Sequence, residues 1–293
     1  GLALRTAKRG GRGSVRRFVA EIHQEDSERR FFLRELEIAI GQNAFEVHYQ
    51  PVVAAEGGGL VGVEALLRWT HPTRGPIAPS MFIPLAEENG LMNRLGELVL
   101  RRALADGARW PSLFVAVNLS PVQMRSRDLV DLTSAILAAT GMPASRLALE
   151  VTEGILIDNP EETLLKLEAF RALGISTALD DFGTGYSSLA YLRRFPFDKL
   201  KIDSSFVLSI EKAPDAAAIV HAVVSLGRGL GMKVTAEGVE NAEQHLFLRA
   251  AGVHSMQGYR FGRPGPAAQI SARLAAPDDY RVRNPDQEIA LAS

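Results

Sequence analysis

Short apolar runs, many of them rich in β-branched residues, alternate with longer amphipathic stretches along most of this chain. Runs of this kind predict strands, and stretches with apolar residues three and four positions apart predict helices. The predicted strands cover residues 45–53, 60–69, 113–120, 147–152, 175–181, 197–202, 232–237 and, with a weaker pattern, 253–258. The predicted helices include residues 128–140, 160–173, 215–230 and 240–250.

Eight strands with helices between most of them favour either an α/β barrel or a doubly wound sheet. The first two strands are joined only by the turn Glu56-Gly57-Gly58-Gly59. This turn is too short for a crossover helix, so we expect the first pair of strands to be antiparallel. A single barrel of roughly 250 residues fits within a chain of 293 residues.

The composition narrows the class of protein and of site. With 46% hydrophobic and 23% charged residues, the chain is typical of a globular protein with a sizeable core. A net charge of −1 provides no global field that would attract nucleic acid or an anionic membrane. The absence of cysteine excludes disulfides, thiolate metal ligands and a cysteine nucleophile. No apolar run approaches the roughly 20 residues of a membrane span, and we expect a cytoplasmic location.

Polar side chains follow nearly every predicted strand, at the point where its apolar run stops. They are Glu64, Asn118, Glu150, Asp180, Asp181, Lys201, Glu237 and Gln257. In a barrel, the carboxyl ends of the strands converge on one mouth, where active sites are found. A set of five carboxylates cannot stay ionised together without cations. Oxygen ligands of this kind suit Mg²⁺ or Mn²⁺ better than Zn²⁺, and adjacent aspartates suit two metal ions that share a ligand.

Two other interpretations compete with this one. A single glutamate after a strand is usually a helix cap or a solvated loop residue, but this explanation becomes improbable for seven strands in succession. A sugar-processing barrel with a carboxylate pair leaves Asn118 and Lys201 without roles. None of the six histidines has metal-ligand spacing with another. Both tryptophans are expected to be packing residues, with Trp69 the better candidate of the two for contact with a base, and His71 could line the pocket near the expected mouth.

An ordered series of motifs resembles the EAL-domain cyclic di-GMP phosphodiesterases. The motifs are Tyr49-Gln50-Pro51-Val52-Val53, Glu64-Ala65-Leu66 with Leu67-Arg68-Trp69, Val117-Asn118-Leu119-Ser120, Glu150-Val151-Thr152-Glu153, Asp180-Asp181-Phe182-Gly183-Thr184-Gly185, Leu200-Lys201-Ile202-Asp203, Ala236-Glu237-Gly238-Val239-Glu240 and Gln257-Gly258-Tyr259. The resemblance spans about residues 31–270. It implies a TIM-like (β/α)8 barrel with the first strand antiparallel. Ser204 and Arg260 depart from the residues that are common in the family.

The resemblance also implies roles for the strand-end residues. Two divalent cations, Mg²⁺ or Mn²⁺, would be the cofactors. Their ligands would be Glu64, Asn118, Glu150, Asp180, Asp181 and Glu237, with Asp180 bridging the ions. By the same resemblance, Lys201 and Glu237 are the catalytic residues. Lys201 would orient a metal-activated hydroxide, and the role of Glu237 as ligand or general base stays open.

Substrate and regulatory contacts follow from the same resemblance. The expected contacts to the dinucleotide are Gln50, Leu66, Arg68, Gln257 and Glu240. Residues 180–189 resemble a loop that links the metal site to a dimer interface. In that loop Gly183, Thr184 and Gly185 are the expected regulatory residues, and Glu153 is expected to anchor it. A homodimer is the implied assembly.

Three parts are predicted along the chain. Residues 1–30 are basic and resemble the end of a GGDEF domain with a linker, which implies a tandem parent protein; a nucleic-acid-binding arm is the rival interpretation. Residues 31–275 would form the EAL barrel, and residues 276–293 a loose tail. We expect no DNA as a partner and no membrane contact from this fragment.

The predicted activity is hydrolysis of cyclic di-GMP to linear pGpG by a hydroxide activated by two metals. The leading alternative is a catalytically silent cyclic di-GMP receptor. All the predicted metal and lysine positions carry the residues that the family pattern requires. This favours the enzyme over the receptor.

Overall fold

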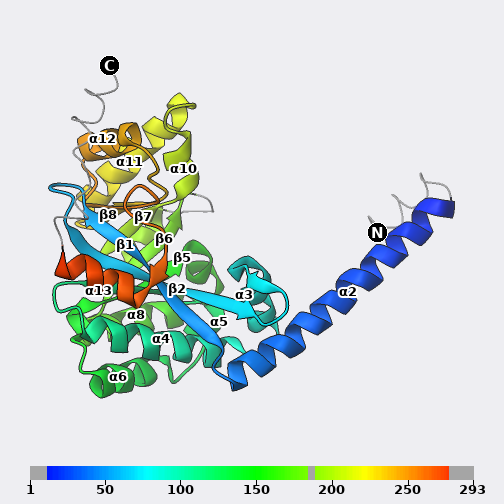
Figure 1. Ribbon diagram of the computed structural model, residues 1–293. Coiled ribbons are helices and arrows are strands. Elements are labelled where there is room, and N and C mark those ends of the chain that lie inside the picture. Colours follow the sequence, from blue (N-terminus) through cyan, green and yellow to red (C-terminus); the bar gives the residue numbers. More distant parts are fainter. Residues whose placement is uncertain (1–11, 184–188, 277–293) are drawn as a thin grey trace. The chain divides into compact units, whose positions relative to one another are not determined.

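The computed structural model of the chain describes residues 12–183 and 189–276 (Figure 1). The contacts within the chain divide these residues into two compact units. The first unit contains the described residues up to Phe45 together with Trp69–Leu91, and the second contains Glu46–Arg68 together with the described residues from Met92 onward. The described residues predicted as metal ligands, catalytic residues and dinucleotide contacts belong to the second unit.

The second unit is built around a closed barrel of eight strands. They are β1 (Phe45–Ala54), β2 (Leu60–His71), β4 (Phe114–Asn118), β5 (Leu147–Thr152), β6 (Ser176–Phe182), β7 (Lys199–Ile202), β8 (Lys233–Ala236) and β9 (Ser255–Gln257). They follow one another round the barrel in this order, and the pairing of β9 with β1 closes it. From β2 to β9, neighbouring strands are parallel. The predicted α/β barrel is confirmed, and the doubly wound sheet is excluded.

The first strand runs against its neighbours, as predicted. Strand β1 pairs antiparallel with β9, in a register that places Val52 opposite Gln257. It also pairs with β2, after a tight turn closed by a hydrogen bond of 2.8 Å from Ala54 N–H to the Gly59 carbonyl. In this turn Gly57 has a φ of 77°, a left-handed value that favours glycine. A short two-residue strand, β10 (Gly265–Pro266), pairs antiparallel with the start of β1.

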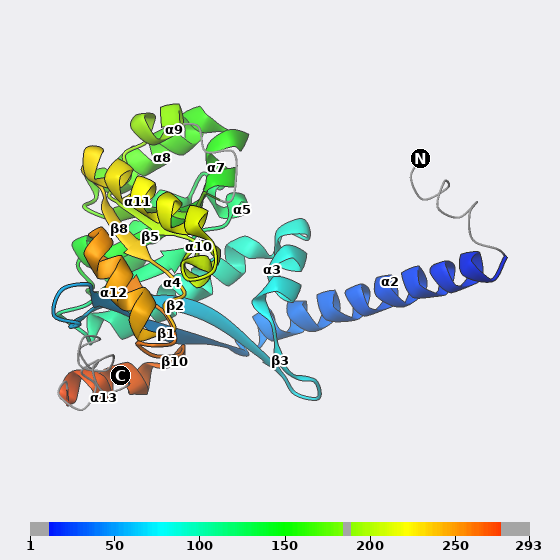
Figure 2. The ribbon, with the colours of Figure 1, turned by 90° about the horizontal axis from the view of Figure 1, so that it is seen from above.

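Helices connect the parallel strands and surround the barrel (Figures 1 and 2). They are α4 (Met92–Ala108), α5 (Pro121–Met124), α6 (Leu129–Thr140), α7 (Glu153–Asp158), α8 (Pro160–Ala172), α9 (Leu189–Arg194), α10 (Ser204–Ser209), α11 (Pro214–Gly229), α12 (Ala242–Ala251) and α13 (Ala267–Ala275), with a 3₁₀ turn at Ala144–Arg146. The predicted start at Asn159-Pro160 is confirmed, because the Asn159 side chain accepts from Glu162 N–H and caps α8.

The strands of the parallel part of the barrel are apolar at most positions and buried. Leu149, Leu200 and Val234 on β5, β7 and β8 are completely buried. Strands covered by helices on one face and by the barrel interior on the other are expected to read as continuous apolar runs. The polar residues at the ends of these runs therefore need another explanation than the packing of the core.

The first unit contains α2 (Arg12–Gly41), β3 (Gly75–Ile77) and α3 (Pro79–Glu88). In this unit Trp69 is 2% exposed, and its ring lies 5.8 Å from Phe45 and 5.6 Å from Phe82, centroid to centroid. His71 is also buried, with Nε2 3.1 Å from Glu35 Oε2. The interpretations of Trp69 as a base contact and of His71 as a pocket residue are therefore wrong. Both side chains are packed inside the first unit, so neither is accessible to a bound base.

Helix α2 begins at Arg12, within the residues 1–30 that were predicted as the end of an upstream domain with a linker. The predicted boundaries at residues 30 and 275 stay predictions. Within the residues that the structure describes, no helix combines the length and the apolar character required to span a membrane.

Candidate functional site

The register of the parallel strands brings the predicted strand-end residues to one end of the barrel. Asn118, the last residue of β4, lies beside Glu150 on β5, and Thr152 on β5 lies beside Asp180 on β6. Lys201 on β7 lies beside Thr235 on β8, two residues before Glu237. Because all these strands run in the same direction, their carboxyl ends deliver the polar side chains to a common region.

Lys201 stands at the centre of a buried group of carboxylates. Its side chain is 3% exposed, and Nζ donates to Glu150 Oε2 at 2.5 Å and to Asp180 Oδ2 at 3.0 Å. The same Nζ lies 2.6 Å from Glu237 Oε1. That buried oxygen nevertheless has no well-directed hydrogen bond among the described residues. One ammonium group thus faces three carboxylates.

Burial and mutual repulsion perturb the carboxylates of this group. Burial raises the pKa of Glu150 well above its usual value, and the charge of Lys201 opposes this only in part. Burial also raises the pKa of Glu237, to about 8, again against the effect of Lys201. For Lys201, burial alone would lower the pKa, but the surrounding carboxylates together raise it well above the usual value. The cluster therefore has more negative charge than its lysine can balance.

A second network fixes Glu64 beside these residues. Glu64 Oε1 accepts from Asn118 Nδ2 at 2.6 Å, and Oε2 accepts from Gln257 Nε2 at 2.5 Å. Gln257 Nε2 also donates to Gln50 Oε1 at 2.9 Å, and Gln50 Nε2 donates to the Gly262 carbonyl at 3.3 Å. Side chains from β1, β2, β4 and β9 thus hold one another in fixed orientations.

The adjacent aspartates at the end of β6 lie on an irregular stretch of backbone. In a regular strand, consecutive side chains point to opposite faces. Here the pairing of β6 with β7 shifts register between Leu179 and Phe182, and Asp181 has a φ of 54°. Asp180 is buried and accepts from Asp181 N–H at 2.9 Å, whereas Asp181 is exposed. Burial and the charge of Asp180 raise the pKa of Asp181.

The composition of the site fits divalent cations. Glu64, Glu150 and Asp180 are each less than 9% exposed, and carboxylate and amide oxygens are the preferred ligands of Mg²⁺ and Mn²⁺. The buried Glu237 Oε1 without a well-directed hydrogen bond points to the same conclusion. Among the described residues, no group of three carboxylate or imidazole side chains is arranged so that it could hold a metal ion. In this structure, carboxylates converge on Lys201 instead.

Glu153 lies where the resemblance placed the anchor of the regulatory loop. It is the first residue of α7, and its Oε1 accepts from Gly183 N–H at 3.0 Å. Gly183 has a φ of 100°, and a Cβ there would lie 2.9 Å from the Phe206 ring. The position therefore requires glycine. Thr184 and Gly185 lie outside the described residues.

A cavity of about 390 Å³ adjoins this cluster. Of the predicted residues, Gln50, Glu64, Leu66, Glu237, Glu240 and Gln257 line it. Arg68 is not among the lining residues; its Nη1 donates to the Leu67 carbonyl at 2.9 Å, and burial lowers its pKa.

Other lining residues of this cavity were not predicted as site residues. They are Ser204, Leu208, Gly238, Gly258 and Tyr259. Tyr259 is half exposed, and the Arg263 guanidinium lies 4.0 Å from the centroid of its ring. In the sequence, Ser204 stands out only as a departure from the family pattern. Tyr259 appears there only as part of the motif Gln257-Gly258-Tyr259. Leu208 on α10 carries no sequence signal, because only the fold brings it to the cavity.

The comparison with known protein families shows to which family this chain belongs. The EAL domain pattern matches residues 33–264. The chain belongs to the EAL domain family. The match covers both the carboxylate cluster and the adjoining cavity, and it confirms the resemblance drawn from the motifs.

Several EAL relatives are similar over nearly the whole chain. An uncharacterised signalling protein of Caulobacter vibrioides is 49% identical over 278 residues, covering 94% of this chain and 34% of its own length. MucR of Pseudomonas aeruginosa, a bifunctional diguanylate cyclase and cyclic di-GMP phosphodiesterase, is 42% identical, covering 93% of this chain and 41% of its own length. A solved structure of the PaMucR phosphodiesterase in complex with c-di-GMP is 44% identical with a TM-score of 0.79, covering 82% of this chain and 99% of that one.

The chain thus spans between a third and about two fifths of the length of these two curated relatives. The names of MucR and of the solved PaMucR structure agree with the prediction that this chain is a phosphodiesterase. The roles of the individual site residues stay predictions.

Proposed function

We propose that this chain hydrolyses one phosphodiester bond of cyclic di-GMP to give linear pGpG, with two divalent cations, Mg²⁺ or Mn²⁺. The observation that carries the proposal is the buried carboxylate cluster around Lys201, next to a cavity at the carboxyl ends of the barrel strands. A relative named as a cyclic di-GMP phosphodiesterase, and a similar phosphodiesterase solved with c-di-GMP, support the choice of substrate.

The ligands of the cations would be Glu64, Asn118, Glu150, Asp180 and Asp181, together with Glu237. The hydrogen bonds from Asn118 and Gln257 to the two oxygens of Glu64 orient that carboxylate before any ion binds. When bound, two such cations would offset the carboxylate charge and activate a water molecule for attack on phosphorus.

Lys201 and Glu237 would handle charge and protons during the reaction. The Lys201 ammonium group contacts Glu150, Asp180 and Glu237; once these carboxylates turn to bound cations, its N–H donors would become available to stabilise a phosphate oxygen. Glu237 has a pKa raised to about 8 by burial. Bound cations would favour the ionised carboxylate, and Glu237 would then serve as a ligand or as the base that accepts a proton from the attacking water.

The dinucleotide would occupy the 390 Å³ cavity, with Gln50, Leu66, Gln257 and Glu240 at its wall. The half-exposed ring of Tyr259 offers a face on which a guanine base can stack. Arg68 would bind a phosphate oxygen after its guanidinium leaves the Leu67 carbonyl.

The test is incubation of the protein with cyclic di-GMP and Mg²⁺ or Mn²⁺, with chromatography of the products. We expect pGpG to appear, EDTA to abolish it and Glu64→Gln to lower the rate by at least about a hundredfold. The matched control is Glu37→Gln, since Glu37 is an exposed residue of α2 that belongs neither to the cluster nor to the cavity. Binding of cyclic di-GMP without any pGpG under either ion would overturn the proposal in favour of the silent receptor.

We also propose a homodimer formed beside α7 and α8. The proposal rests on the resemblance to the EAL family, and Ile157 on α7 and Leu165 on α8, which are 52% and 66% exposed, are apolar side chains that a partner copy would remove from water. Sedimentation should show a dimer that Leu165→Glu converts to a monomer, and an unchanged monomeric mass of the wild type would contradict this.

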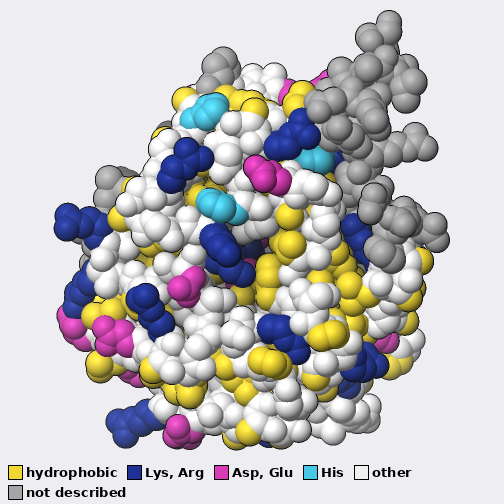
Figure 3. All heavy atoms as spheres, turned by 90° about the vertical axis from the view of Figure 1, so that its left-hand side faces the viewer, with side chains coloured by type: hydrophobic (Ala, Val, Ile, Leu, Met, Phe, Trp, Pro, Cys, Tyr) yellow, Lys and Arg dark blue, Asp and Glu magenta, His cyan; other side chains and the backbone are white. Residues whose placement is uncertain are grey.

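DNA is not a proposed partner, and the cytoplasmic location stays a prediction. On the face shown in Figure 3, Lys and Arg side chains stand apart among neutral, apolar and acidic ones.

A further inference from the structure

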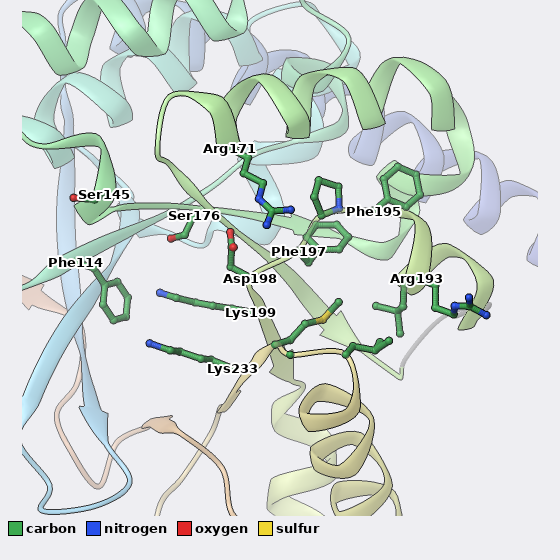
Figure 4. A pocket seen from close by; sticks show the side chains of 15 residues that line it. Phe114, Ser145, Arg171, Ser176, Arg193, Phe195, Phe197, Asp198, Lys199 and Lys233 are labelled. Atoms are coloured by element: carbon green, nitrogen blue, oxygen red, sulfur yellow. The ribbon is translucent and has the colours of Figure 1, made fainter.

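The amino ends of several barrel strands border two cavities of about 770 Å³ and 740 Å³. Both cavities are lined by Phe114, Lys199 and Lys233, which lie at the starts of β4, β7 and β8. The carboxylate cluster lies at the carboxyl ends of these strands, so the two cavities belong to the opposite end of the barrel. In Figure 4, the Lys199 and Lys233 side chains extend side by side into the first cavity.

Basic residues dominate the charged walls of these cavities. The first is lined by Arg171, Arg193, Lys199 and Lys233, and the second adds Arg228 and Arg249. The acidic residues among the lining are Asp198 in the first and Glu56 in the second. Asp198 Oδ2 already accepts a hydrogen bond of 2.8 Å from Thr177 N–H. The walls therefore carry an excess of positive charge.

The two shared lysines lie without a carboxylate at ion-pair distance among the described residues. Lys199 Nζ lies 3.5 Å from the centroid of the Phe114 ring, a cation–π contact. Burial lowers the pKa of Lys199 to about 8; the charges of Glu150 and Asp198 oppose this shift, and the charge of Lys233 adds to it. An anion between the two ammonium groups would remove this repulsion.

We propose that the first of these cavities binds a small molecule that carries a diphosphate or triphosphate group. Lys199 and Lys233 are register partners on neighbouring parallel strands, so their backbones lie about 4.8 Å apart. This spacing lets two ammonium groups contact the oxygens of linked phosphates.

The arginines of the first cavity extend the same argument. Arg171 comes from α8 and Arg193 from α9, so cations from four separate elements surround the cavity. A singly charged anion would leave most of them unpaired, whereas linked phosphates engage several at once. The volume of 770 Å³ lies within the roughly 300–1,000 Å³ of small-molecule sites.

The test is calorimetric titration of the EDTA-treated protein with inorganic pyrophosphate, and with inorganic phosphate as a weaker second probe. The variant is Arg171→Gln combined with Lys233→Gln, because both side chains are exposed and their loss leaves the core intact. The matched control is Arg94→Gln, which removes an exposed charge of α4 outside both cavities. Circular dichroism and the melting temperature show whether each variant folds.

We expect saturable pyrophosphate binding to one site, tighter than phosphate binding and unchanged in Arg94→Gln. One unit charge at about 4 Å in a water-like medium alters a dissociation constant about fivefold, so the double variant should weaken binding about 25-fold. Equal binding by the double variant and the wild type, or no saturable binding at millimolar pyrophosphate, would overturn the proposal. Because no cyclic di-GMP is used, this result is independent of the proposed activity.

Discussion

Replacing Glu237 with Gln should stabilise the protein in the absence of divalent cations, and increasingly so as the pH rises. Burial raises the pKa of Glu237 from 4.5 to about 8. Between these values the folded protein keeps a proton that the unfolded chain has lost, so the free energy of unfolding falls with increasing pH. Below about pH 4.5, Glu237 is protonated in both the folded and the unfolded protein. Above about pH 8, the folded protein bears the full free-energy cost of the buried, ionised carboxylate. A glutamine does not titrate and escapes this penalty.

The size of the stability difference follows from the difference between the pKa values of Glu237 in the unfolded and the folded protein. One pKa unit corresponds to about 1.4 kcal/mol, so the shift from 4.5 to about 8 amounts to about 5 kcal/mol. The advantage of the glutamine variant should therefore be near zero at the acid end and approach about 5 kcal/mol at the alkaline end. In exchange, the variant should lose most of its phosphodiesterase activity, because it lacks a proposed ligand or base.

The measurement is urea unfolding in EDTA between about pH 5 and pH 8, followed by the fluorescence of the buried Trp69 and Trp110. Glu168→Gln is the control, since its exposed side chain should leave the pH dependence as in the wild type. Added Mg²⁺ should then stabilise the wild type more than the Glu237→Gln variant, because a ligand stabilises the state that binds it. If the free energies of the wild type and of Glu237→Gln run parallel over the whole pH range, the reasoning is wrong.

Three further predictions concern single contacts. Gln257→Leu removes the donor to two buried acceptors and should lower the free energy of unfolding by about 1–3 kcal/mol in urea titrations. Glu153→Ala removes the acceptor of Gly183 N–H and should lower the hydrolysis rate while circular dichroism stays unchanged, with partial rescue by Glu153→Gln. Gly258→Ala would place a Cβ 2.1 Å from the Val239 carbonyl oxygen and should cost at least about 2 kcal/mol of stability, seen as a lower melting temperature.

Much of the barrel could be predicted because its strands are apolar, short and separated by helices. The strand predicted at 147–152 is observed as Leu147–Thr152 without change. The strand predicted from residue 197 begins only at Lys199, since the Phe197 N–H bonds to the Phe195 carbonyl in a turn. Periodicity reveals which residues are apolar but not where the pairing of strands starts.

The sequence allowed the prediction that the strand-end residues lie together, but not the prediction of the contacts that they make with one another. Carboxylates at successive strand ends indicated a shared location, because parallel strands deliver them to one mouth. The position of the Lys201 ammonium between Glu150 and Asp180 depends on the register of three strands, which no local pattern encodes. The burial of His71 against Glu35 is likewise a contact across 36 positions of the chain.

The left-handed backbone conformation of Asp181, at the end of β6, limits which side chains this position can accept. Asp181 has a φ of 54°, a region that Asn and Asp tolerate better than other residues with side chains. A glutamate would keep the charge but strain the backbone, and an asparagine would keep the backbone but lose the charge. Glycine would relax the bend and provide no oxygen. No single exchange preserves both the bend and the negative charge, so we expect natural variation to be narrower here than at the regular strand ends.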